Sequence, residues 1–115
     1  MKVAKPTKTA LIKRERARMA EIFRDLDENK LKIAGPLISR AAFLTVSIAE
    51  LEEQINREGW TEEYQNGSAQ KGVKRSAAAD AHIALTKNLT AITKQLLEIV
   101  PPAARSGRLQ ELMRR

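Results

Sequence analysis

Few side chains in this sequence suit catalysis or metal binding. The 115 residues include one histidine, His82, and no cysteine, which excludes a thiolate site and a paired-histidine metal site. The five glycines are too dispersed for a phosphate-binding loop. Asp25, Asp27 and Glu28 have a spacing that suits a cation site, but it suits the polar face of a helix equally well, and we favour the helix face. We therefore expect no catalytic residue, no metal and no cofactor.

The basic residues are the stronger functional signal. The net charge is +7, and it is concentrated at the two ends of the chain. Residues 1–24 hold eight basic and two acidic residues, and residues 101–115 hold four basic residues and one acidic residue. Clustered lysine and arginine bind phosphate groups and release counterions, so we favour nucleic-acid contact over a merely solubilising face. The candidate DNA-binding residues are Lys2, Lys5, Lys8, Lys13, Arg14, Arg16, Arg18, Lys71, Lys74 and Arg75.

Helices must position these residues. Alanine, leucine, glutamate, lysine and arginine are abundant and aromatic residues are rare, which favours an all-α fold. Residues 1–9 are expected to form a flexible basic arm, 10–100 a single helical domain, and 101–115 a basic C-terminal tail. An apolar stripe recurs every seven residues from Ile12 to Ile33. Glycine and proline at Ala34-Gly35-Pro36 are expected to separate the first helix from the second. The helices expected are 10–33, 36–58 and 77–100.

Local signals set the other helix ends. Gly59 has the position of a helix C-terminal glycine, Ser76 suits an N-cap, and Pro101-Pro102 ends the third helix. Between these helices, Asn66-Gly67 is typical of a two-residue hairpin turn. A small β-hairpin and an ordered loop both fit residues 60–73, and this choice stays open. His82 falls on the apolar seam of the third helix, where a packed or half-solvated role is favoured over proton transfer.

The second and third helices are matched in length, so a long antiparallel helical hairpin is expected, together with a basic N-terminal helix. The second helix carries more apolar surface than one neighbour covers, which favours a homo-oligomer such as a ring. The stretch from Leu37 to Leu51 is too polar and short to span a bilayer, so we expect a cytoplasmic protein. The interface residues expected are Leu37, Ala41, Phe43, Leu44, Val46, Ile48, Leu51, Ile55, Leu85, Leu89, Ile92 and Leu96.

The order of short motifs over residues 37–108 resembles a known family. Gly59-Trp60, Tyr64-Gln65-Asn66-Gly67 and Gln70-Lys71-Gly72 lead into a helix bearing Lys87-Asn88-Leu89-Thr90, and Pro101-Pro102-Ala103-Ala104-Arg105 follows it. This pattern is similar to that of the small subunits of bacteriophage DNA-packaging terminases. The N-terminal third departs from the family, so a DNA-binding role for residues 1–24 depends on charge alone.

The resemblance implies a non-catalytic homo-oligomer, ring-like, that binds double-stranded viral DNA in the cytoplasm of the bacterial host. It would present that DNA to the large terminase subunit, which carries the ATPase and nuclease. The acidic stretch from Glu50 to Glu63, or the tail, would meet that subunit. Two other hypotheses stay open: a helical adaptor that binds proteins through its apolar helix face, and a small DNA-binding regulator.

Overall fold

The computed structural model describes residues 4–68 and 70–101 of the chain. Most of these residues are helical, as expected, and the element order is α1 (Lys8–Ile22), α2 (Glu28–Glu58), β1 (Thr61–Asn66), β2 (Gln70–Arg75) and α3 (Ala77–Ile99). Lys2 and all of the C-terminal tail except Pro101 lie outside the described residues.

The break between the first two helices lies earlier in the chain than the sequence pattern predicts: the first helix ends eleven residues before the expected position and the second begins eight residues before it, so that boundary prediction is wrong. Helix α1 ends at Ile22, and α2 begins at Glu28 and runs through Pro36. Asp27 caps α2, because its side chain accepts a hydrogen bond from the Lys30 amide at 2.9 Å. Phe23 is buried in the connecting turn and fixes it against the core.

Pro36 is tolerated inside α2 because of where it lies. A proline inside a helix removes one backbone hydrogen bond, which leaves the carbonyl four residues earlier without its donor. Lys32 and Pro36 are both exposed, so water can reach that carbonyl. On either side Ala34 and Ile38 are buried in the core, so packing holds the helix together across the proline.

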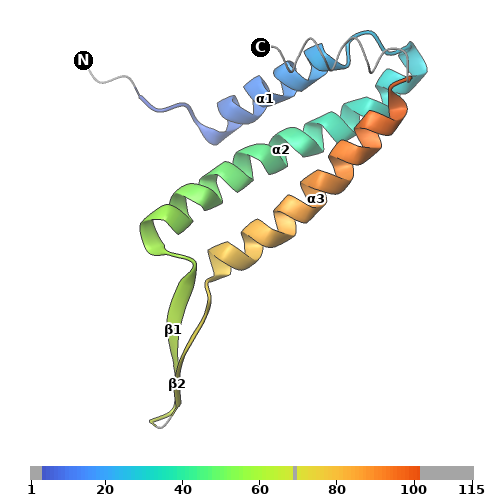
Figure 1. Cartoon of the computed structure of the whole chain (residues 1–115). Coiled ribbons are helices and arrows are strands. Elements are labelled where there is room, and N and C mark those ends of the chain that lie inside the picture. The colour runs from blue at the N-terminus through green and yellow to red at the C-terminus, as the bar shows by residue number, and fades with distance from the viewer. Residues whose placement is uncertain (1–3, 69, 102–115) are drawn as a thin grey trace.

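Helix α2 is the central element, packed against α1 on one side and α3 on another (Figure 1). Helices α2 and α3 form the expected antiparallel hairpin: His82, near the start of α3, lies beside Glu52, near the end of α2. At the other end Leu96 joins Ile38 and Phe23 in the main core cluster. The core therefore sits where the α1–α2 turn meets the last turns of α3.

The caps expected around the α2–α3 connection are confirmed. Gly59 ends α2 with φ +92°, a conformation that favours glycine. Ser76 caps α3, because its Oγ accepts a hydrogen bond from the Ala79 amide at 3.1 Å. The hairpin alternative for residues 60–73 is also confirmed, with Thr61 paired to Arg75 and Asn66 to Gln70.

The turn of this hairpin differs from the expected one. A two-residue turn centred on Asn66-Gly67 would need positive φ at both residues. Only Gly67 has it, at +71°, while Asn66 is the last residue of β1 and pairs with Gln70. The loop therefore begins at Gly67, one residue later than a turn centred on Asn66-Gly67 requires. Figure 1 shows the hairpin projecting away from the three helices.

The chain is extended for its size. Its radius of gyration is 18.9 Å, against about 13 Å for a compact domain of this length. Its accessible surface is 8769 Å², against roughly 6,300 Å² for a compact monomer of the same mass. A single copy therefore leaves an unusually large surface open to partners.

The expected oligomer interface needs a correction. Five of its twelve residues are buried inside the single chain and belong to its own core: Ala41, Leu44, Val46, Ile55 and Leu96. Helix α1 accounts for part of this burial, since Val46 lines a groove between α1 and α2. Of the rest, Phe43 is 46% exposed, and the half-buried members are Leu37, Ile48, Leu51, Leu85, Leu89 and Ile92.

Helix α2 as a whole meets a test of length and hydropathy for a membrane-spanning helix, although residues 37–51 alone are too polar and too short to span a bilayer. The whole helix has 31 residues, and an 18-residue window of it reaches a mean hydropathy of 1.4. By length and composition alone it could cross a bilayer. A central helix that is packed between two others passes the same test, and 39% of this window is buried against the rest of the chain.

Candidate nucleic-acid interface

Helix α1 packs one narrow stripe against α2 and leaves its basic residues outside. Ile12, Met19 and Ile22 are half-buried at helical spacing. Lys13, Arg14 and Arg16 lie between these positions and are exposed. Within the described part of the chain, none of these three residues forms an ion pair. They are therefore available to an outside anion.

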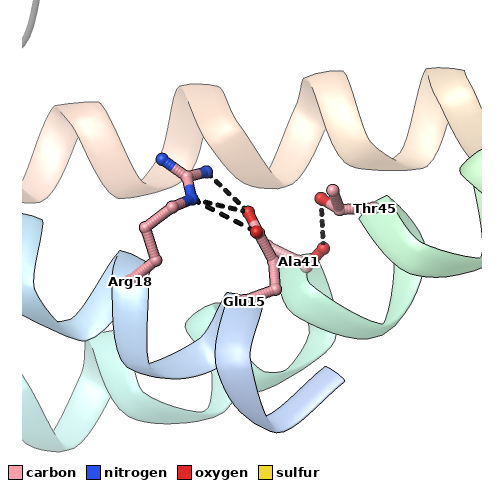
Figure 2. A network of polar contacts seen from close by, with 4 residues as sticks. All are labelled: Glu15, Arg18, Ala41 and Thr45. Carbon is pink, nitrogen blue, oxygen red and sulfur yellow. Dashed lines mark hydrogen bonds and ion pairs between the residues drawn. The ribbon is translucent and has the colours of Figure 1, made fainter. Parts of the chain in front are cut away.

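Arg18 differs from these three because its charge is compensated nearby. Its Nε lies 3.1 Å and its Nη2 2.5 Å from the Glu15 carboxylate (Figure 2). This hydrogen bond raises the pKa of Arg18 above its ordinary value. Because arginine is already charged at neutral pH, this shift leaves the charge of Arg18 unchanged there. Arg18 therefore adds less to the net field of α1 than its neighbours do.

Thr45, the nearby residue of α2 in Figure 2, takes no part in this pair. Its hydroxyl donates to the Ala41 carbonyl at 2.8 Å, one turn earlier in the same helix. Thr45 therefore leaves the Glu15 carboxylate to Arg18.

Lys8 is also occupied within the chain. Its Nζ lies 2.7 Å from the Glu50 carboxylate and 4.9 Å from the centre of the Phe43 ring. Both partners belong to α2, so Lys8 holds the start of α1 against that helix. Lys5 is exposed in the segment just before it.

Two grooves run between α1 and α2, and they differ in charge. The groove that carries Arg14 and Arg18 also carries acidic side chains, from Glu15, Glu50 and Glu53. Among the described residues, the charged lining of the other groove consists of Lys13 and Arg16, and the remaining lining is Ala17, Ala20, Leu31, Gly35, Ile38 and Ser39. The second groove therefore presents positive charge without local compensation, and a phosphate would be attracted there more strongly.

The basic residues of β2 form a separate group. Lys74 lies 3.5 Å from Glu62 across the hairpin, Arg75 lies 2.6 Å from Asp80, and Lys71 is exposed. The hairpin projects from the end of α2 that lies farthest from the α1–α2 turn (Figure 1). The basic residues expected to bind DNA are therefore divided between two places, and α1 holds the less compensated group.

His82 packs in the seam, as expected. It is half-buried, its ring lies edge-on to Trp60 with centroids 5.6 Å apart, and its Nε2 lies 3.4 Å from Glu52. Among the residues that the structure describes, no three acidic or histidine side chains gather where a metal ion could bind.

The sequence did not predict the groove beside Lys13 and Arg16, because residues of α2 form its other side and their position depends on how α1 packs on α2. Leu31 and Gly35 line that side because α2 begins as early as Glu28. The Asp27 cap was the one local signal that could have indicated this earlier start.

No protein-family model, curated protein or solved structure matches the chain.

Proposed function

We propose that this protein is the small, non-catalytic subunit of a bacteriophage DNA-packaging terminase. It binds double-stranded viral DNA as a homo-oligomer in the cytoplasm of the bacterial host and presents it to the large ATPase and nuclease subunit. The observation that carries the DNA-binding part is the set of exposed cations on α1, Lys13, Arg14 and Arg16, which have no ion pair within the described part of the chain.

The shape and surface of the chain support self-association. The accessible surface exceeds that of a compact monomer by roughly 2,500 Å², and a standard protein interface buries about 1,600 Å² in total. Phe43 of α2 remains 46% exposed and Ile33 61% exposed. An oligomer would cover such surface and would repeat the cations of α1 around its symmetry axis.

The resemblance of residues 37–108 to terminase small subunits supports the more specific part of the proposal. The chain has a helix, an Asn-Gly hairpin and a second helix in the order of that family. The acidic stretch from Glu50 to Glu63, or the tail, is the surface that we assign to the large subunit.

Salt-dependent DNA binding tests the role of α1. The variant Lys13→Gln/Arg14→Gln/Arg16→Gln removes three phosphate contacts per copy, so the slope of log affinity against log salt should become shallower by about 2.7 for each copy that contacts the DNA. The measurement is fluorescence anisotropy with random duplex DNA over a range of salt concentrations.

A matched control removes the same charge elsewhere. Arg57, Lys87 and Lys94 are exposed and have no ion pair within the described residues, so Arg57→Gln/Lys87→Gln/Lys94→Gln lowers the net charge equally. It should leave the slope close to that of the wild-type protein. Equal slopes for the two triple variants would contradict a DNA site on α1.

A helical adaptor is the second candidate, favoured by the exposure of Ile33 and Phe43 on α2. An adaptor would use this apolar surface for another protein, and the charge of α1 would serve solubility. Retention of wild-type DNA affinity by the α1 triple variant would favour it.

A further inference from the structure

Within the described residues, the β-hairpin packs little against the helices, and its one ion pair to them joins Arg75 to Asp80. All residues of β1 and β2 are exposed except Gly72, which is half-buried under the Tyr64 ring. An isolated two-stranded hairpin is at best marginally stable in water. Val73 is 67% exposed at its centre, on the face opposite Tyr64. The hairpin therefore has an apolar centre and two open edges that a further strand would stabilise.

The hydrogen-bond phase of the hairpin shows which groups those edges offer. The Ser76 amide donates to the Trp60 carbonyl at 2.9 Å, so these two residues form a hydrogen-bonded pair. In an antiparallel ladder, hydrogen-bonded pairs alternate with non-hydrogen-bonded pairs. In the register of Thr61 with Arg75, the hydrogen-bonded pairs are therefore those of even-numbered residues. The odd-numbered residues therefore direct their backbone groups outward. Within the described residues neither edge, β1 at Glu63 or β2 at Val73, pairs with a further strand, so both offer backbone donors and acceptors.

The two edges carry opposite charge. Strand β1 contains Glu62 and Glu63 and no base, while β2 contains Lys71, Lys74 and Arg75 and no acid. Pairing β1 with β1, or β2 with β2, would put like charges opposite one another, which destabilises a sheet. Pairing β1 with β2 of another copy brings opposite charges together.

We propose that the partner of this hairpin is a second copy of the chain, and that β1 of each copy pairs antiparallel with β2 of the next. This deepens the proposed function, since it rests on the homo-oligomer described there. The contact joins two different edges, so it is head-to-tail and closes into a ring when the rotation between copies permits. The hairpins of a closed ring form an up-and-down barrel, which leaves no open edge.

Glu63 and Lys71 are the pair we assign to this contact. Both are exposed, both occupy outward positions, and neither has an ion pair within the described part of the chain. Their side chains lie on the same face as Val73, because alternate residues of a strand share a face. Glu63 of one copy facing Lys71 of the next would neutralise both and cover Val73.

Charge reversal and mixing test the pairing. Glu63→Lys alone and Lys71→Glu alone put like charges across every contact, and each should weaken assembly about fivefold per interface. An equimolar mixture of the two variants should recover the assembly in trans, since alternating copies restore opposite charges at every contact. With one variant labelled with ¹⁵N, native mass spectrometry reads out both the mass of the assembly and its equal content of the two variants, and circular dichroism reports that the helices are intact.

Two results would overturn the strand pairing: single variants that assemble like the wild-type protein, or a mixture that assembles no better than its components. If the two substitutions acted only within a single chain, mixing the variants would not restore assembly. The proposed function is tested by a separate measurement. It would fail if the wild-type protein bound no DNA through α1. Wild-type DNA binding together with unaffected assembly of E63K and K71E would reject the hairpin contact alone.

Discussion

At the scale of single residues, position decides what the basic side chains can do. Lys8 and Arg18 are paired with carboxylates, at Glu50 and Glu15, whereas Lys13 and Arg16 border a groove that no acidic residue lines within the described part of the chain. The sequence identified the basic cluster but could not separate these roles, because Glu50 is distant in the chain and meets Lys8 only after α1 packs on α2.

Gly72 offers a prediction at this scale. A Cβ at this position would lie 2.5 Å from the Tyr64 hydroxyl oxygen, so Gly72→Ala should displace the tyrosine ring from the strand. In NMR spectra the ring-current shift of residue 72 should be lost. As a control, Gly35→Ala in α2 meets no atom within 4 Å and should stabilise the helix by about 0.5–1 kcal/mol. An unchanged Tyr64 position in Gly72→Ala would contradict the packing described.

At the scale of elements, residues with a local physical role were predictable. Gly59 and Ser76 end and begin helices in the expected places because each acts through its own backbone or side chain. The α1–α2 break was missed because the apolar stripe continues across it: Met19 and Leu26 both pack on the core. The stripe then fails at Ile33, which is 61% exposed. Periodicity alone could not show that the helix restarts with a different phase.

The cap at Asp27 gives the prediction for this scale. Asp27→Ala removes the hydrogen bond to the Lys30 amide and should cost about 1 kcal/mol of stability, which lowers Tm by roughly 4 °C. Differential scanning calorimetry measures this shift. Asn29→Ala, an exposed change in the first turn of the same helix, should leave Tm nearly unchanged. Equal Tm values for the two variants would argue against α2 starting at Asp27.

At the scale of the whole molecule, the chain is an extended three-helix unit with a projecting hairpin. The antiparallel arrangement of α2 and α3 was predictable from matched lengths and the returning connection. The packing of α1 on α2 was not, because the charge of α1 indicated a surface and gave no sign of its neighbour. That packing buries Val46. The apolar surface that remains available to a partner therefore lies at Phe43, at Ile33 and on the hairpin.

The mass of the wild-type protein in solution tests the central claim most directly, since the DNA-binding surface and the hairpin contact are both proposed for an assembly of copies. Multi-angle light scattering at micromolar concentration should return a mass several times the 12.9 kDa of one chain. A mass of one chain at every concentration tested would contradict the account.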